Sequence, residues 1–179
     1  VLSKIAALLP THTRRSEESQ ALQQFSTPLP MAFAAIAAAK ISASDCMLEP
    51  SAGTGLMAVL GQTAGASLIL NELSQTRADL LDGLFPAMPL TRFDAAQIHD
   101  YLDPTAVPSV VVMNPPFSSL INVEGRVGDA GFRHIQSALH RLAPGGRLVT
   151  ITGANVGPEM PGWRDAFSRL QANCKIVFS

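Results

Sequence analysis

The hydrophobic and polar positions of this 179-residue chain alternate between short apolar runs and longer segments of mixed character. The short runs have the length and composition of β-strands, and Ser109–Met113 is the most strand-like of them. The strands predicted in this way are Cys46–Glu49, Ser67–Asn71, Pro89–Phe93, Ser109–Met113, Arg147–Thr152 and Lys175–Ser179.

The segments before and between these runs predict helices. Met31–Lys40 follows two prolines and is rich in alanine, a strong helix former. Asp129 is a suitable N-cap for a helix that ends where Pro144-Gly145-Gly146 follows Leu142. The predicted helices are 1–9, 16–25, Met31–Lys40, Gly55–Gly61, Ser74–Leu84, Asp129–Leu142 and Gly162–Ala172.

The alternation of strands with helices of about ten residues predicts β-α-β units and therefore a parallel sheet. The fold class expected is α/β, a Rossmann-like, mostly parallel sheet with helices on both faces. The expected organisation is one such domain over residues 31–179, preceded by an N-terminal helical extension over residues 1–30. Because the chain starts without Met and stops inside a strand-like run, we expect it to be a fragment of a longer protein.

Composition and charge narrow the function only slightly. With 47% hydrophobic and 15% charged residues and a net charge of −1, the chain has no overall basic field for nucleic acid. Residues 1–113 carry 6 basic against 10 acidic residues, whereas residues 114–179 carry 7 against 4. A polyanion would therefore be drawn to the last third, although these charges fit an ordinary solvated surface equally well.

The cysteines, apolar stretches and histidines indicate which features the chain lacks: a disulfide framework, a membrane segment and a metal site. Cys46 and Cys174 are too few for a disulfide framework, which favours a reduced, cytoplasmic setting. The apolar stretches Val1–Leu9 and Met31–Ala39 are shorter than the ~20 residues that span a bilayer, so no membrane segment is predicted. The four histidines show no ligand spacing with cysteines or acids, and no metal site is predicted.

A glycine turn connects the first predicted strand to its helix, in the sequence Glu49-Pro50-Ser51-Ala52-Gly53-Thr54-Gly55. Gly53 and Gly55 permit unusual backbone angles and close approach of a ligand to the backbone. An isolated Gly-x-Gly is equally consistent with a plain strand-to-helix turn. Glu49 in turn either faces a cationic ligand group or orients the turn by accepting backbone N–H groups.

Two further carboxylates follow the next two strands. Glu72, nineteen residues after Gly53, is placed to accept hydrogen bonds from ribose hydroxyls, or else to cap the helix beginning near Ser74. Asp94, at the end of the third strand, is a candidate for ligand recognition or for a helix N-cap. Both carboxylates should lie at the edge of the sheet where ligands gather.

The sequence Asn114-Pro115-Pro116-Phe117 directly follows the most apolar strand. The Asn114 side-chain oxygen and the Pro115 carbonyl can accept hydrogen bonds from the two N–H groups of a planar amine, and Phe117 offers a ring for stacking a base. The alternative is a rigid turn with Phe117 in the core. Its position after a fully apolar strand, downstream of the glycine turn, favours the functional interpretation.

In this order and spacing the motifs resemble those of S-adenosylmethionine-dependent amino methyltransferases of the N6-adenine type. The resemblance implies a methyltransferase sheet, S-adenosylmethionine as cofactor, and an acid like Asp94 that receives the cofactor's adenine amino group. It also implies that Glu49 holds the methionine ammonium group and that Thr27 contacts the methionine carboxylate, in a segment that covers the cofactor. The matching pieces are Phe25-Ser26-Thr27-Pro28, Glu49–Gly55 with Ser51, Asn71-Glu72-Leu73, Phe93-Asp94 and Asn114–Phe117.

The resulting hypothesis is methyl transfer to an amino nitrogen, with adenine N6 in DNA or RNA as the favoured acceptor. Nucleic acid is then the expected partner, although no separate target-recognition domain fits within 179 residues. Asn-Pro-Pro-aromatic also serves methylation of glutamine side chains in proteins. A third alternative is a non-catalytic cofactor-binding module, because the chain is also similar to the methylase-like segment of bacterial helicase-associated proteins related to strawberry notch.

Overall fold

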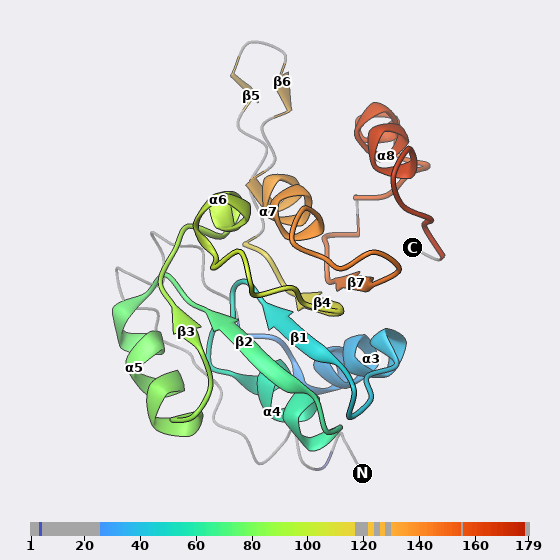
Figure 1. Ribbon diagram of the computed structural model, residues 1–179. Helices are drawn as coiled ribbons and strands as arrows, with labels where there is room; N and C mark the ends of the chain where they lie inside the picture. Colours follow the sequence, from blue (N-terminus) through green and yellow to red (C-terminus); the bar gives the residue numbers. More distant parts are fainter. Residues whose placement is uncertain are drawn as a thin grey trace.

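The computed structural model describes residues 26–116, 122–123, 126–127, 130–154 and 156–177, together with Lys4. A five-stranded sheet with strand order β3-β2-β1-β4-β7 forms its centre, and every pair of neighbours is parallel (Figure 1). The strands are β1 (Cys46–Glu49), β2 (Ser67–Asn71), β3 (Leu90–Thr91), β4 (Val110–Met113) and β7 (Arg147–Thr150).

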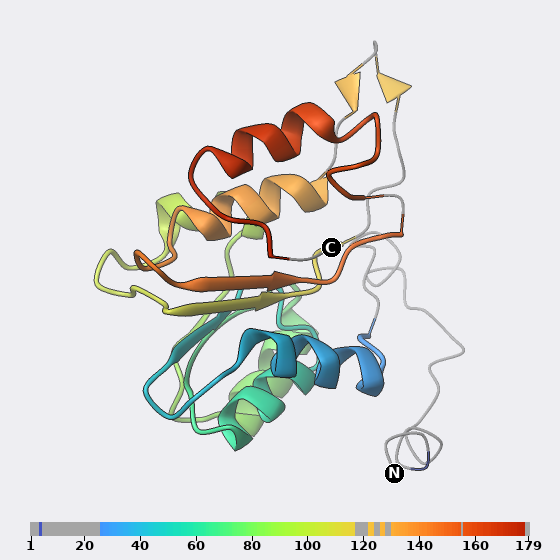
Figure 2. The same cartoon turned by 90° about the vertical axis from the view of Figure 1, so that its right-hand side faces the viewer.

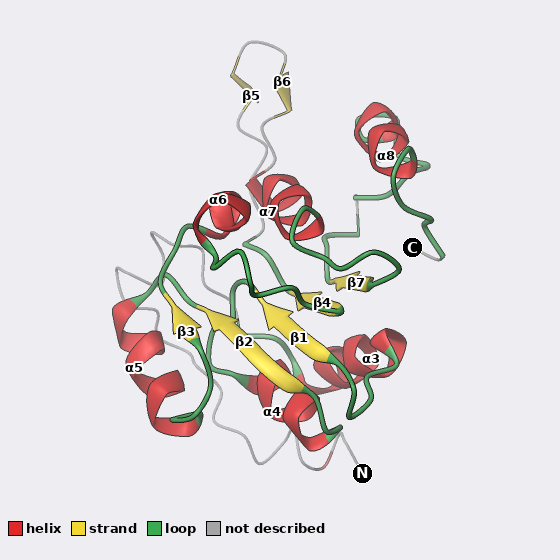
Figure 3. Cartoon of the chain, in the orientation of Figure 1, coloured by secondary structure: helices red, strands yellow, loops and turns green. Residues whose placement is uncertain are grey.

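Helices cover both faces of this sheet (Figures 2 and 3). One face is covered by α3 (Leu29–Ala39), α4 (Leu56–Thr63) and α5 (Gln75–Leu84). The other is covered by the 3₁₀ turn η1 (Ala95–Gln97), α6 (Ile98–Tyr101) and α7 (Ala130–Leu139), with α8 (Arg164–Gln171) outermost. The predicted α/β fold, a mostly parallel sheet with helices on both faces, is therefore confirmed.

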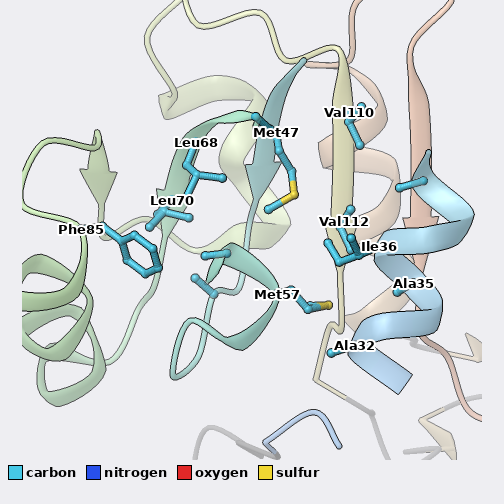
Figure 4. Close-up of a cluster of buried hydrophobic side chains, with 14 of the residues drawn as sticks. Ala32, Ala35, Ile36, Met47, Met57, Leu68, Leu70, Phe85, Val110 and Val112 are labelled. Atoms are coloured by element: carbon cyan, nitrogen blue, oxygen red, sulfur yellow. The ribbon is translucent and has the colours of Figure 1, made fainter. Parts of the chain in front are cut away.

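Successive side chains of β4 enter two separate cores. Val110 and Val112 pack into the core under α3, α4 and α5 (Figure 4), whereas Val111 and Met113 face the helices on the opposite side. All four side chains are fully buried, which explains why this strand is apolar without alternation. β4 lies inside the sheet, between β1 and β7.

The sheet differs from the prediction at its ends. The predicted strand Lys175–Ser179 is wrong over residues 175–177, which form no strand and leave Val177 78% exposed; Phe178 and Ser179 lie outside the described residues. β3 is shorter than Pro89–Phe93 because the Phe93 N–H donates to the Asn71 side chain at 2.8 Å instead of to a strand partner.

Several short elements were not predicted. The antiparallel hairpin of β5 (Asn122–Val123) and β6 (Arg126–Val127), like η1 and α6, is too short to show a hydrophobic period. The predicted helices 1–9 and 16–25 lie outside the described residues, apart from Lys4. The boundary predicted at residue 30 falls inside α3, which begins at Leu29.

At the amino ends of the strands, Asp45 joins three parts of the sheet. Its buried carboxylate accepts hydrogen bonds from the Ser42 backbone N–H at 2.8 Å, the Ser109 hydroxyl at 2.7 Å and Arg147 Nη2 at 2.8 Å. Arg147 also donates from Nε to the Ala39 carbonyl at the end of α3, at 2.8 Å. Asp45 therefore holds β1, β4, β7 and α3 in register. Burial disfavours its ionised form, but the hydrogen bonds from Ser109, Ser42 and Arg147 outweigh this and hold the pKa of Asp45 below its usual range.

We expect Asp45→Asn to lower the free energy of unfolding at pH 7 by about 1.5–3 kcal/mol, the usual range for hydrogen bonds to a charged group. Because the pKa is lower in the folded than in the unfolded state, this contribution is present above the unfolded pKa of ~3.9 and is lost as the pH falls below it. Urea unfolding of both proteins at several pH values should show their difference shrinking towards pH 2. A difference that stays constant over this range would contradict the role of the charge.

Candidate functional site

A cavity lies at the carboxyl ends of the strands, where ligands bind in open parallel sheets. The loops that follow β1, β2, β3 and β4 all contribute to its wall, and the segment before α3 and helix α7 add further residues. Most of the predicted site residues line it together: Thr27, Glu49, Ser51, Gly53, Glu72, Asp94, Asn114 and Pro115.

The two glycines of the turn after β1 have different roles. Both have positive φ, +59° at Gly53 and +83° at Gly55. A Cβ on Gly53 would meet nothing closer than Arg77 Nη1 at 3.5 Å, so this residue exposes its backbone to the cavity. A Cβ on Gly55 would lie 2.8 Å from Leu81 Cδ2 and 3.0 Å from Phe85 Cε2, and Gly55 does not line the cavity. The space for a side chain at Gly55 is therefore filled by α5 and the residue that follows it, whereas Gly53 leaves its backbone open to the cavity.

Glu72 joins two loops of the site. Its buried carboxylate accepts hydrogen bonds from the Gly53 backbone N–H at Oε2, 2.7 Å, and from the Ser74 backbone N–H at Oε1, 2.9 Å. Ser74 is the N-cap of α5, so Glu72 supports the start of that helix, whereas its role with a ribose stays a prediction. Since each carboxylate oxygen has two lone pairs, Glu72 can still accept hydroxyl groups of a ligand while it holds the glycine turn.

Glu49 is a carboxyl group in an unusual environment, with 1% of its surface exposed. The Ala58 backbone N–H in the first turn of α4 donates to it, but Oε2 is buried and receives no hydrogen bond from any described residue. Burial, and to a lesser degree the charge of Glu72, raises the pKa of Glu49 well above its usual range. A cationic ligand group beside Oε2 would stabilise the ionised carboxylate.

Asp94 combines a capping role with a place in the cavity wall. Its Oδ1 accepts a hydrogen bond from the Ala96 backbone N–H at 2.9 Å and so caps η1. The same oxygen lies 3.9 Å from Nε2 of His134, a buried residue of α7 that also lines the cavity. Asp94 itself stays about half exposed, which leaves its carboxylate accessible to a ligand.

Asn114 is held by a residue 87 positions away in the sequence. Its Nδ2 donates to the Thr27 hydroxyl at 3.0 Å, while Oδ1 is buried and receives no hydrogen bond from any described residue. Since an unsatisfied buried acceptor is costly, this oxygen indicates a place where a ligand donor belongs. Phe25 and Phe117 lie outside the described residues, so their predicted roles remain predictions.

Sequence reasoning missed several residues of the cavity wall. Asn71 carries a readable signal, since it is a polar residue at the end of an otherwise apolar strand. His134 and Arg77 lie on helices, and the sequence does not indicate which of their faces meets the loops. The cavity residues to which the sequence analysis assigned no role include Ser26, Met57, Asn71, Arg77 and His134.

Two further observations apply only to the described part of the chain. Within it, no three His, Cys, Asp or Glu side chains come together as a metal site would require. None of its helices has the length and apolar character that crossing a bilayer demands.

Solved structures identify the fold, whereas no family profile and no curated protein matches the sequence. A protein from Pyrococcus horikoshii that is described as an RNA methyltransferase superposes with a TM-score of 0.63 at 19% identity, over 94% of this chain and 80% of that one. TrmN from Thermus thermophilus gives a TM-score of 0.59 at 20% identity, over 76% of this chain and 41% of its own. A type I restriction-modification methyltransferase subunit from Streptococcus thermophilus gives 0.55 at 14%, over 72% and 34%.

These likenesses show that the chain has the Rossmann-like fold that these methyltransferases share. It spans less than half the length of two of the three proteins. One fold of this kind serves many different reactions, so the fold alone does not identify a substrate.

The contrast between the two glycines gives a test in the ligand-free protein. Gly53→Ala meets open space, so its cost is the left-handed backbone alone, ~1–2 kcal/mol. Gly55→Ala adds a clash with two core side chains and should cost roughly 1–3 kcal/mol more in the free energy of unfolding. Urea denaturation measures both values, and an equal loss in the two variants would mean that Gly55 is not packed as described.

Proposed function

We propose that this chain uses S-adenosylmethionine to methylate an amino nitrogen, with adenine N6 in DNA or RNA as the favoured acceptor. The observation that carries the proposal is the buried Oδ1 of Asn114, which receives no hydrogen bond from the described residues and lies in the same cavity as Glu49, Gly53 and Glu72. An amide oxygen in this position can accept a hydrogen bond from the N–H of an amine, which is the group the proposed chemistry must activate.

The cavity fits the proposed cofactor at several points. Glu49 Oε2 suits the methionine ammonium group, and the remaining lone pairs of Glu72 suit the ribose hydroxyls. The bare backbone of Gly53 permits close approach of the part of the cofactor that joins its methionine ammonium group to its ribose. Asp94 is assigned to the adenine amino group, Thr27 to the methionine carboxylate and Ser51 to the wall beside it, with Phe25 as part of the covering segment.

When bound, S-adenosylmethionine supplies a methyl group on a positively charged sulfur. The acceptor amine is a poor nucleophile because its lone pair is conjugated into the ring. Asn114 Oδ1 and the Pro115 carbonyl accept hydrogen bonds from its two N–H groups, favour a pyramidal nitrogen and direct the lone pair at the methyl carbon. As the nitrogen–carbon bond forms, the carbon–sulfur bond breaks, and one amine proton then leaves to solvent. Thr27 contributes by fixing the amide of Asn114.

Three considerations support a nucleic acid as the acceptor. The Asn-Pro-Pro-Phe motif is typical of adenine N6 chemistry, and Phe117 would stack the target base. Two of the similar structures are named as methyltransferases of RNA or of a restriction-modification system. The last third of the chain is also the more basic part. Since the chain spans only part of these proteins, we assign target recognition to further domains or subunits.

We also place the protein in the cytoplasm, as part of the same proposal. Both of its cysteines, Cys46 and Cys174, are free thiols. Reduced thiols suit the cytoplasm, where methyl donors and nucleic acid meet.

The raised pKa of Glu49 predicts a pH-dependent affinity for S-adenosylhomocysteine, the demethylated cofactor. The ligand ammonium group favours the ionised carboxylate, so affinity should rise as the pH increases through the raised pKa of Glu49 and fall below it. Glu49→Gln should weaken binding and remove this dependence. Calorimetry below the pKa of the ligand's own amino group measures the effect, and adenosine, which lacks the ammonium group, is the control. Parallel pH profiles for the wild type and Glu49→Gln would assign the ammonium group elsewhere.

Transfer from methyl-labelled cofactor to DNA, RNA or cell protein tests the acceptor. We expect label in nucleic acid, at adenine N6. Asn114→Ala should reduce turnover by ~10²–10³-fold, the usual loss for one preorganised group, while affinity for S-adenosylhomocysteine stays nearly unchanged. Label in protein glutamine would move the activity to that acceptor. Cofactor binding without any transfer would indicate a non-catalytic module, and full activity of Asn114→Ala would refute the amine-activation mechanism.

A further inference from the structure

The side chain of Asn71 uses its full hydrogen-bonding capacity inside the protein, and the residue is 1% exposed. Its Nδ2 donates to the Pro50 carbonyl at 2.8 Å and to the Phe93 carbonyl at 2.9 Å. Its Oδ1 accepts from the Thr91 hydroxyl at 2.8 Å and from the Phe93 backbone N–H at 2.8 Å. An amide with two donors and two acceptor lone pairs is thereby satisfied.

The partners fix which way the amide of Asn71 points. A backbone N–H can only donate and a backbone carbonyl can only accept, so Oδ1 must face the Phe93 N–H and Nδ2 must face the two carbonyls. Reversing the amide would place Nδ2 against an N–H donor and Oδ1 against carbonyl oxygens. Asn71 therefore has one orientation and holds both groups of partners at fixed distances.

These partners belong to the two loops on either side of β2. Pro50 starts the glycine turn after β1, and the Asn71 backbone carbonyl also accepts the Ala52 N–H of that turn at 2.9 Å. Phe93 immediately precedes Asp94 after β3. In the proposed function, the first loop holds the methionine end of the cofactor and the second holds its adenine end. The side chain of Asn71 hydrogen-bonds directly to both loops.

We infer that Asn71 is a positioning residue that sets the separation of these two loops and so selects a ligand in which a nucleoside is joined to an amino acid. This inference rests on the proposed function. A ligand that spans two subsites gains affinity only when their spacing matches its own length. A wrong spacing should therefore penalise the joined ligand far more than a fragment that occupies one subsite.

Thr91 allows this idea to be tested without altering the cavity wall. Its hydroxyl donates to Asn71 Oδ1, but Thr91 does not itself line the cavity. Thr91→Val removes the bond at nearly constant volume, and Thr91→Ser keeps the hydroxyl. Asn71→Asp places an acceptor oxygen against the Pro50 and Phe93 carbonyls and should force the loops apart. Asp45→Asn breaks a hydrogen-bonded hub at the opposite edge of the sheet and serves as the control for lost stability.

The experiment compares the affinities of S-adenosylhomocysteine and adenosine by titration for the wild type and the four variants. We expect Asn71→Asp to weaken S-adenosylhomocysteine binding at least about tenfold while adenosine changes by less than about threefold. Thr91→Val should show the same selective loss in smaller measure, Thr91→Ser should restore binding, and Asp45→Asn should leave both affinities unchanged.

Other results overturn the inference. Equal weakening of both ligands in Asn71→Asp, or wild-type affinities in both Asn71→Asp and Thr91→Val, would show that Asn71 does not set the spacing. If the wild type binds S-adenosylhomocysteine with the expected pattern but transfers no methyl group, the inference stands and the proposed function fails. If the folded wild type binds no S-adenosylhomocysteine, both are wrong.

Discussion

The central strands of this protein are buried on both faces, and the rest of the structure depends on that constraint. β1 and β4 lie between two layers of helices, so the side chains in the middle of both strands must be apolar. Their backbone N–H and C=O groups are hydrogen-bonded within the parallel ladder. Polar side chains can find hydrogen-bond partners only where the strands end and the loops begin. The chemistry-bearing residues therefore collect in the loops at the carboxyl edge, and the ion pair of Asp45 and Arg147 closes the amino edge.

The two edges solve the burial of polar groups in opposite ways. At the amino edge every oxygen of Asp45 receives hydrogen bonds, so the charged group stabilises the sheet. At the carboxyl edge, Glu49 and Asn114 each keep one buried oxygen that no described residue satisfies. Leaving such acceptors unsatisfied lowers the stability of the free protein. Asn71 and Glu72, which are satisfied, supply the rigidity that keeps these two acceptors in place.

The sequence was sufficient for the parts of the fold that depend on local pattern. The unbroken apolar run Val110–Met113 indicates a strand covered by helices on both faces. The predicted pairing of the glycine turn with Glu72 corresponds to a direct hydrogen bond from the Gly53 N–H to the Glu72 carboxylate. It was insufficient where a long-range partner decides the outcome. Phe93 lies outside the strand because its N–H donates to the Asn71 side chain. Residues 175–177 form no strand although Ile176 and Val177 are apolar. Gly53 and Gly55 look alike in the sequence, and only the positions of Leu81 and Phe85 separate their roles.

The hydrogen bond between Thr27 and Asn114 has a consequence for how the domain matures. Its two residues are separated by 87 positions, with β1, β2, β3 and their helices between them. Contacts of such sequence separation form late, because the intervening chain must first be ordered. A chain that has built only its first three strands already possesses Glu49, Gly53, Glu72 and Asp94, but it lacks an oriented Asn114. The cavity wall contributed by the first three strands therefore precedes the final orientation of Asn114, whose amide is fixed only when the two distant segments have met.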